Sequence, residues 1–441
     1  MVDDDAVARF SALIRVPTVS KADPAETDWT AFSRFREVLA EQYPLVHERL
    51  ERELVAEHSL LYRWPGGDPA LPPAILMAHQ DVVDPGDVAA WEHAAFGAER
   101  DGDVLHGRGT IDDKGSLAGI LEAVEQLLAA GFAPRRDLLL VFGHDEETHG
   151  TGARAIAELL GQRRVAPAFV LDEGGAIVED VLPGTTGRLA VIGLAEKGAA
   201  NIRLSVAETG GHSSTPPAIS AIGRLARAIA RIDAAPSPAR MTDATRKMFA
   251  AAGTAARGMH RFLYRNIAWT APLLRRILAR GGPETAAMVR TTRVATVISG
   301  GHAQNAIPER AEATVNARIL PGESVGTVVE RIRHDIRDPL VVVEADGGWD
   351  PSPISPTDGY GWELLTSVLA DLEPGTTPIP YTQNGATDSR SFTGLTPAVY
   401  RFTPFHLTIG ERGALHAIGE RIRVSSWLAG VAFYRELIGR L

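Results

Sequence analysis

The sequence AILMAHQD at residues 74–81 decides the fold class of the N-terminal part of the chain. Its first five residues form an apolar run that is too short for a typical helix and therefore predicts a buried strand. Two further apolar runs, LLLVF at 138–142 and AFVL at 168–171, predict strands in the same way. Between these runs, apolar residues recur at helical spacing after Gly115 and again over 153–160. Strands that alternate with helices predict an α/β fold, in which helices flank both faces of a mostly parallel sheet.

The middle of the chain has a different order of elements. The order is strand, helix, strand, strand, helix, strand, which is the ferredoxin-like α+β pattern. These six elements are expected near residues 201–206, 219–232, 291–299, 311–319, 324–336 and 339–344. Because 441 residues exceed one ordinary core, two domains are expected. We expect residues 196–347 to form an inserted domain, and residues 1–195 and 348–441 to form together the domain that receives it.

The composition excludes several classes of protein. The chain has no cysteine, so disulfides, zinc ribbons and a cysteine nucleophile are excluded, and any transition metal must be held by His, Asp and Glu. The net charge of −10 argues against a general nucleic-acid binder, which needs a basic surface. The acidic start does not resemble a secretory signal, and no apolar stretch is long enough for a membrane span. A cytoplasmic enzyme is the simplest expectation.

Residues 236–282, inside the predicted inserted domain, form a basic and apolar helical insertion. The segment carries nine Lys and Arg residues against one acid. Phe262 and Trp269 are among its apolar residues and would line a slot for a long acyl chain in one interpretation. In another, its arginines meet an anionic lipid surface or an acidic partner. The simplest interpretation, which we favour, is an amphipathic hairpin that packs on the inserted domain with its arginines in water.

Five clusters of acidic residues and histidines stand out, and most of them follow a predicted strand. In open α/β sheets, ligand sites gather at the carboxyl ends of strands. Each cluster alone also has a simpler explanation, such as a surface turn, a capped glycine-rich loop or a solvated acidic loop. The clusters are His79 with Asp81, Asp112 in GRGTIDDKG at 107–115, the three carboxylates of 145–147, Asp172 with Glu173, and His416.

An alternative interpretation is a dinucleotide-binding site. The sequence GTGARA at 150–155 fits a GxGxxA pattern before a helix, and Asp172 lies 20 residues beyond Gly152. However, seven residues separate the end of the preceding strand, near Gly143, from the first glycine. The tight strand–turn–helix that binds a pyrophosphate is therefore missing, which disfavours an NAD-dependent enzyme.

Taken in order, the motifs resemble those of a known family. The set HxD, GRGxxDDKG, DEE, DEGG, GHSS and a late LH resembles the co-catalytic metallopeptidases that include aminoacylase, carboxypeptidase S and succinyl-diaminopimelate desuccinylase. The resemblance covers essentially the whole chain and is strongest to carboxypeptidase S and the N-acyl amino acid synthase/hydrolase branch. It implies a zinc-exopeptidase-like catalytic domain, an inserted lid and dimerisation domain, and a homodimer.

The resemblance also implies a paired metal site. His79 would bind one metal ion, His416 the other, and Asp112 would bridge both. Glu147 would bind the ion that His416 holds. The ions are expected to be Zn²⁺, with Co²⁺ or Mn²⁺ as alternatives. Such a pair lowers the pKa of a bound water and polarises the scissile carbonyl, and a bridging position needs a carboxylate with two usable oxygens, as in Asp112.

The last metal ligand would be Asp172, with Glu173 as the alternative. Asp81 would orient the ring of His79, and Glu146 would act as the general base. By the same resemblance, the peptide bond between Asp112 and Asp113 is expected to be cis.

Three further residues are candidates for contacting the substrate. His212 would hold the developing oxyanion, usually in the active site of the partner subunit, and Asn305 would lie beside it. Arg390 would grip a substrate carboxylate, or would instead pair with Asp388. The expected reaction is hydrolysis of the amide bond of an N-acyl amino acid or short peptide, with reversal to synthesis possible. A non-catalytic binding protein on the same fold is a further alternative, which Glu146 argues against because a binder needs no base.

Overall fold

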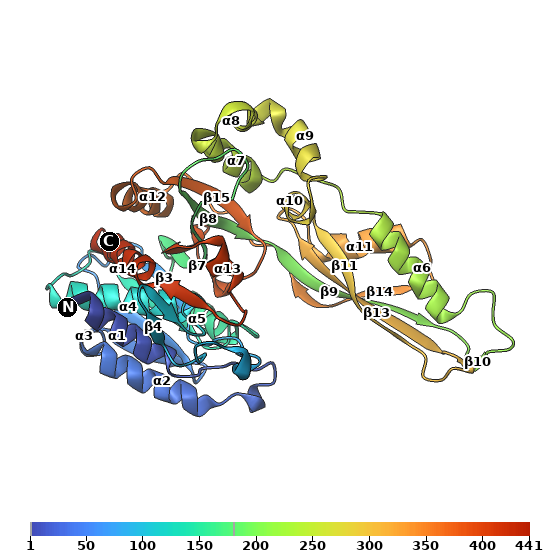
Figure 1. Cartoon of the computed structure of the whole chain (residues 1–441), viewed down its shortest axis with the longest axis horizontal. Helices are drawn as coiled ribbons and strands as arrows, with labels where there is room; N and C mark the ends of the chain where they lie inside the picture. Colours follow the sequence, from blue (N-terminus) through green and yellow to red (C-terminus); the bar gives the residue numbers. More distant parts are fainter. Residues whose placement is uncertain (1, 180) are drawn as a thin grey trace.

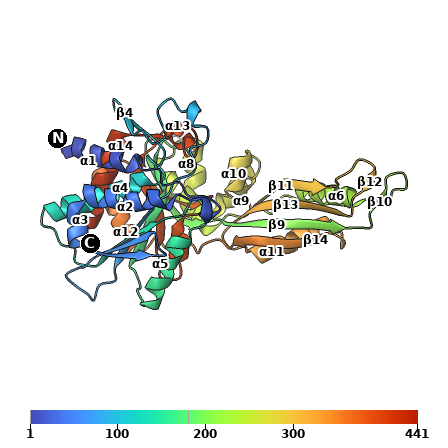
Figure 2. The same ribbon diagram turned by 90° about the horizontal axis from the view of Figure 1, so that it is seen from below.

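The computed structural model describes residues 2–179 and 181–441, and the chain forms two lobes (Figure 1). The larger lobe surrounds an eight-stranded sheet and contains both ends of the chain. The second lobe is elongated and extends away from the first, as the view from below also shows (Figure 2). The two lobes match the expected α/β domain with an inserted α+β domain.

The large lobe is built on a mixed sheet with a parallel centre. Strands β6, β3, β7 and β16 are parallel neighbours, whereas β1, β2 and β8 each join an antiparallel pair and β15 runs parallel to β8. In sheet order the strands are β1 (Glu51–Val55), β2 (Ser59–Trp64), β6 (Leu138–Gly143), β3 (Ala74–His79), β7 (Phe169–Val178), β16 (Val399–His406), β8 (Leu189–Glu196) and β15 (Thr377–Gln383). The three strands expected in the N-terminal part are thus confirmed.

Helices cover both faces of this sheet, which explains why its central strands are apolar runs. Every residue of β3 and β6 is buried. Along β3, Leu76 packs into the core on one face and Ile75 and Met77 into the core on the other, as the alternation of a strand requires. The first face is covered by α1 (Val2–Ile14), α4 (Lys114–Ala129), α12 (Tyr360–Leu372) and α14 (Val424–Gly439), and the second by α5 (Thr151–Gln162) and η3 (Asp388–Phe392).

Smaller elements complete the large lobe. Helices α2 (Trp29–Gln42) and α3 (Pro44–Arg49) pack next to α1 and α4, respectively. Strands β4 (Glu99–Asp101), β5 (Val104–His106) and β17 (Arg421–Arg423) form a three-stranded sheet. The short helix α13 (Ile409–Gly413) precedes the loop that contains His416.

The elongated lobe has the ferredoxin-like arrangement. Its four strands lie in the order β11, β13, β9, β14, and all three pairs are antiparallel. Their bounds are β9 (Gly198–Ala207), β11 (Thr292–Gly300), β13 (Arg310–Ile319) and β14 (Val342–Trp349), with helices α6 (Ala221–Ala234) and α11 (Val325–Ile336). A short pair, β10 (Gly211–His212) and β12 (Ala306–Ile307), forms the tip. We propose 196–347 as the span of the insertion, of which the segment 236–282 packs on the large lobe.

The basic segment 236–282 does not pack where the sequence suggested. It forms α7 (Asp243–Ala255), α8 (Gly258–Arg265) and α9 (Ile267–Leu278), followed by α10 (Pro283–Ala287). Helix α7 packs against β15, and Phe249 joins the core of the large lobe. The expectation of a hairpin on the inserted domain is therefore wrong, because α7 packs on the edge strand of the large sheet and α8 and α9 pack on α7. In the described part of the chain, no helix is both long and apolar enough to cross a membrane.

Candidate metal centre

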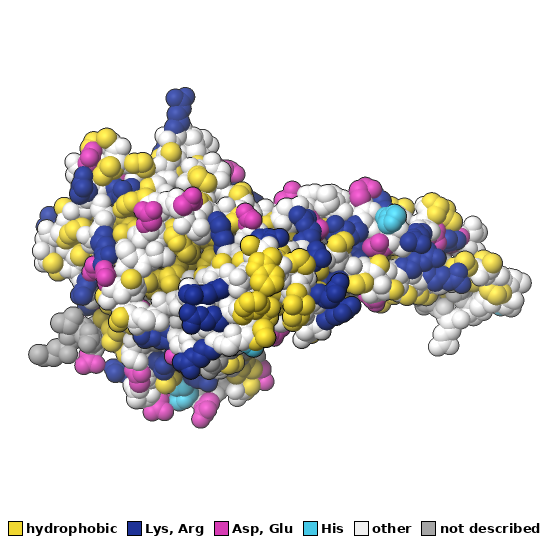
Figure 3. Space-filling model, turned by 90° about the horizontal axis from the view of Figure 1, so that it is seen from above, with side chains coloured by type: hydrophobic (Ala, Val, Ile, Leu, Met, Phe, Trp, Pro, Cys, Tyr) yellow, Lys and Arg dark blue, Asp and Glu magenta, His cyan; other side chains and the backbone are white. Residues whose placement is uncertain are grey.

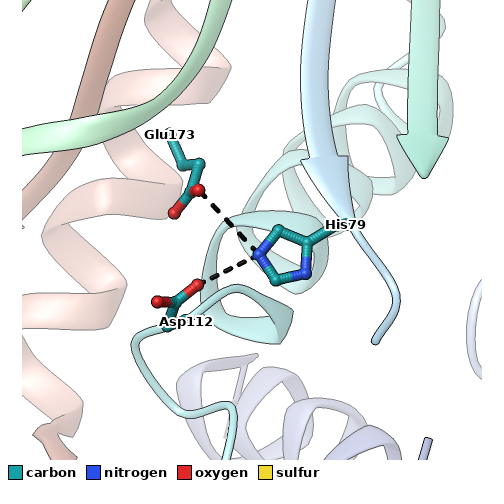
Figure 4. A group of neighbouring side chains, drawn as sticks. All are labelled: His79, Asp112 and Glu173. Atoms are coloured by element: carbon teal, nitrogen blue, oxygen red, sulfur yellow. Dashed lines mark hydrogen bonds and ion pairs between the residues drawn. The ribbon is translucent and has the colours of Figure 1, made fainter. Parts of the chain in front are cut away.

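The first group of metal-ligand type lies where β3 ends. The buried ring of His79 has its Nε2 atom 3.0 Å from Oδ1 of Asp112 and 3.9 Å from Oε1 of Glu173 (Figure 4). The ligand-type atoms of these three residues all lie within 4.8 Å of one another. His79 comes from the sheet, Glu173 from the neighbouring strand β7 and Asp112 from the loop before α4, so three elements meet at one point.

A second group uses the other oxygen of the same aspartate. Nε2 of His416 lies 2.9 Å from Oδ2 of Asp112 and 3.2 Å from Oε2 of Glu147. Asp112, Glu147 and His416 also have ligand-type atoms within 4.8 Å of one another. The two groups therefore share Asp112, with one carboxylate oxygen facing each.

The structure separates Asp172 from Glu173. Both lie in β7, whose successive side chains point to opposite faces. Glu173 points toward His79, whereas the carboxylate of Asp172 accepts a hydrogen bond of 2.8 Å from the backbone N–H of Ser389. Glu173 is thus the residue that the structure brings to the first group, and Asp172 supports the chain at η3.

Asp81 links the histidine to the acidic loop. Its carboxylate is fully buried and lies 3.3 Å from Nδ1 of His79. It also accepts hydrogen bonds from the hydroxyl of Ser20 at 2.7 Å and from the backbone N–H groups of Glu146 and Glu147, both at 3.1 Å. The single carboxylate of Asp81 therefore fixes both the ring of His79 and the loop that carries Glu146 and Glu147.

Glu420 anchors the loop of Asp112 and is a functional residue that the sequence did not single out. Its fully buried carboxylate accepts hydrogen bonds from the backbone N–H groups of Gly109, Ile111 and Asp112 at 3.0, 2.8 and 3.2 Å. It also accepts one from Arg108 at 2.7 Å. The peptide bond between Asp112 and Asp113 is cis, as expected. The only signal for Glu420 in the sequence was its position four residues after His416.

The electrostatics of the site favour cations. Burial raises the pKa of Glu146 and of Glu173 well above the usual value, and nearby carboxylates add to the shift. Hydrogen bonds to Asp112 and Glu147 raise the pKa of His416 to about 10. Oε1 of Glu147 is buried and has no hydrogen-bond partner in the described part of the chain. A pair of divalent cations would offset the crowded carboxylates and supply that missing partner, so the residues fit such a pair.

The remaining candidates lie apart from the two groups. His212 and Asn305 are neighbours at the tip of the elongated lobe, where the N–H of Ser213 donates to the carbonyl of Asn305 at 3.1 Å. This tip is far from the large sheet in the same chain (Figure 1). The guanidinium of Arg390 lies over the ring of Trp349 at 4.6 Å, and among the described residues it forms no ion pair with Asp388.

The comparisons with known proteins identify a metallopeptidase family, which agrees with the two metal-ligand groups of the structure. A family model, described as peptidase family M20/M25/M40, matches residues 75–440. The chain belongs to this family. It is therefore a metallopeptidase-type enzyme that hydrolyses amide bonds, and the alternative of an NAD-dependent or non-catalytic protein finds no support.

Relatives place the chain in the expected branch of the family. The human protein "N-fatty-acyl-amino acid synthase/hydrolase PM20D1" is 37% identical over 99% of this chain and 88% of its own length. "Probable carboxypeptidase S-like 2" of Dictyostelium discoideum is 35% identical over 99% of this chain and 85% of its own length. These similarities confirm the resemblance of the motifs to the carboxypeptidase S and N-acyl amino acid synthase/hydrolase branch.

Solved structures share the fold. An M20 family metallo-carboxypeptidase from Sulfolobus solfataricus superposes with a TM-score of 0.70 at 16% identity and covers 98% of both chains. A Bacillus subtilis protein described as a dinuclear metal-binding peptidase from the M20 family has a TM-score of 0.61 at 14% identity, covering 99% of this chain and 98% of its own. The expected α/β fold with an inserted domain is thereby confirmed.

Proposed function

We propose that the enzyme hydrolyses the amide bond of an N-acyl amino acid that carries a free carboxylate, with a pair of divalent metal ions. The observation that carries the proposal is Asp112, whose two oxygens each face one histidine-containing group. In support, the human relative is named an N-fatty-acyl-amino acid synthase/hydrolase. A short peptide as substrate, and reversal to synthesis, belong to the same proposal.

The proposed ligands are the five residues of the two groups. His79 and Glu173 would hold one ion, His416 and Glu147 the other, and Asp112 both. Glu173 takes the place of Asp172, because its oxygen and not that of Asp172 faces His79. Histidine nitrogens and carboxylate oxygens without sulfur suit Zn²⁺, and Co²⁺ or Mn²⁺ as alternatives. When bound, the pair would activate a water and polarise the scissile carbonyl.

Glu146 is the proposed general base. Its backbone is held by Asp81, the residue that also orients His79, so the base and the first histidine share one support. It would take a proton from the attacking water and pass it to the leaving nitrogen.

We further propose that His212 acts in the active site of a partner subunit of a homodimer, beside Asn305. His212 is exposed at the tip of the elongated lobe, away from the metal centre of its own chain. Strand β11 forms one edge of the four-stranded sheet and exposes Val294, Val297 and Ile298. Such an edge is suited to pair with its own copy. There His212 would donate a hydrogen bond to the developing oxyanion.

Arg390 is the proposed contact for the substrate carboxylate. Its guanidinium has no carboxylate partner among the described residues and stacks on Trp349, the last residue of β14. A stacked guanidinium keeps its donors free for a bidentate contact.

The cytoplasm is the proposed location of the enzyme, which fractionation of the host cell would test.

The substrate proposal is tested with matched pairs of compounds. The Zn²⁺-loaded enzyme would be assayed on N-acyl amino acids, on dipeptides and on the same N-acyl amino acids with the carboxylate converted to a neutral amide. We expect cleavage of the N-acyl amino acids and at least a tenfold lower kcat/KM for the neutral amides, about the loss of one charge-assisted contact. Equal rates for acids and amides would overturn the carboxylate requirement, and cleavage of dipeptides alone would overturn the N-acyl substrate.

A further inference from the structure

Helix α9 is apolar on two faces, although only one of them is covered. Leu274 and Leu278 are buried on the inner face. On the outer face, Trp269, Leu273 and Ile277 follow one another at intervals of four residues, which places them in one row. Trp269 is 62% exposed. A helix at the surface of a globular protein usually carries polar residues on its outer face, so this second apolar row needs a separate explanation.

Helix α8 extends the row into a patch. Met259 and Phe262 are 68% and 50% exposed, and the ring of Phe262 meets that of Trp269 edge-on with 5.5 Å between the centroids. We define the outer patch as these two residues with the three exposed apolar residues of α9. In the view onto these helices, hydrophobic side chains gather in one area with Lys and Arg side chains around it (Figure 3). Large apolar side chains in such a cluster mark an interaction surface.

The charge around the outer patch is strongly positive. The segment 236–282 carries nine basic residues and one acid in a chain whose net charge is −10. Six of its arginines are exposed, and in the described part of the chain none of the six forms an ion pair. They are Arg257, Arg261, Arg265, Arg275, Arg276 and Arg280. The surface therefore offers free guanidinium groups to an anionic partner.

We propose that the outer patch docks on an anionic lipid bilayer. Apolar side chains on one face of a short helical hairpin enter the boundary between headgroups and acyl chains, and arginines beside them meet lipid phosphates. Charge complementarity favours an anionic occupant, and the exposed apolar row beside the arginines favours a bilayer. A second copy of the chain on the same patch would bring arginines against arginines, which is unfavourable. The inference concerns the surface of α8 and α9 and is independent of the proposed substrate.

The test is co-sedimentation of the full-length, metal-loaded protein with vesicles. Vesicles of phosphatidylcholine alone would be compared with vesicles that contain phosphatidylglycerol as the anionic lipid. We expect binding to the anionic vesicles, which rising salt weakens, and little binding to phosphatidylcholine alone. Arg276→Glu with Arg280→Glu should weaken binding at least about 25-fold, since each basic residue near an anionic membrane contributes a factor of about five.

One further variant pair and two single control variants complete the test. Trp269→Ser with Leu273→Ser should also weaken binding at least about tenfold. The matched controls, Arg227→Glu for the charge change and Leu54→Ser for the apolar change, alter exposed residues elsewhere and should bind like the unchanged protein.

Three outcomes would overturn the proposal. One is no binding to anionic vesicles at low salt. A second is equal weakening by the control variants. The third is a change of oligomeric state, without vesicle binding, in the variants of the outer patch, which would identify the patch as an interface between proteins. All variants alter exposed side chains, and hydrolysis of a short, water-soluble N-acyl amino acid at the rate of the unchanged protein reports that each one has folded. Lack of that activity in the unchanged protein would concern the proposed function and not the lipid surface.

Discussion

Glu420→Ala is the substitution whose cost can be worked out most directly from the structure. The change removes the acceptor of three backbone N–H groups and the partner of the buried guanidinium of Arg108. Loss of one member of a buried ion pair costs about 3–5 kcal/mol, because the other charge stays buried. Each amide left without an acceptor adds about 1 kcal/mol, and less where water enters the new cavity. We therefore expect the free energy of unfolding to fall by about 4–8 kcal/mol, with the lower end where water reaches the three amides, which is a large share of the stability of an ordinary domain.

The same substitution should weaken metal binding. Glu420 holds the loop that positions Asp112, and loss of a residue that orients a ligand typically lowers metal affinity about 10–100-fold. Urea unfolding at saturating Zn²⁺ would measure the stability, and competition with a chelator would measure the affinity. Glu436→Ala is the matched control, because it breaks a partly exposed ion pair with Arg440 and should cost at most about 1 kcal/mol. A loss below about 1 kcal/mol for Glu420→Ala would refute the anchoring role.

Three further predictions concern the active site. Glu146→Gln should lower kcat about 10²–10⁴-fold while the protein still binds two metal ions per chain; retained activity would exclude Glu146 as the base. Glu173→Gln should reduce bound metal, whereas Asp172→Asn should leave it at two ions, and elemental analysis showing the reverse would restore Asp172 as the ligand. Mixing inactive His212→Ala with inactive Glu146→Gln should recover activity in heterodimers, because one composite site is intact. No recovery despite demonstrated subunit exchange would exclude action of His212 in the partner's site.

The elements of the fold were predictable where local patterns are strong. The apolar runs at 74–78 and 138–142 became the buried strands β3 and β6, because helices cover both faces of the sheet there. The antiparallel edge was not predicted. Strand β1 has the sequence ERELV and is mostly exposed, so neither an apolar run nor clear alternation marks it, and its pairing with β2 decides its structure.

The choice between Asp172 and Glu173 needed the structure. The sequence placed the end of the strand near Leu171, so both acids belonged to a loop in which either one was free to face the site. Strand β7 instead continues to Val178, and strict alternation along it sends the two side chains to opposite faces. Because the expected strand ended several residues before the true end of β7, the choice of metal ligand between Asp172 and Glu173 stayed open.

Long-range contacts account for the other differences. Glu420 lies more than 300 residues from the loop that it anchors, and no local pattern encodes a contact over that separation. The basic segment 236–282 shows its amphipathic character in the sequence, but the strand against which it packs, β15, comes about 100 residues later. Helical periodicity can reveal that a face is apolar, and only the tertiary fold decides whether that face is covered.

The most direct test of the shared metal site is a crystal structure of the Zn²⁺-loaded enzyme, with anomalous scattering measured at the zinc edge. We expect two peaks per chain, on either side of the Asp112 carboxylate and about 3.5–4 Å apart, as in other two-metal sites. His79 and Glu173 should bind one of them, and His416 and Glu147 the other. A single peak, or a pair that Asp112 does not bridge, would contradict the account.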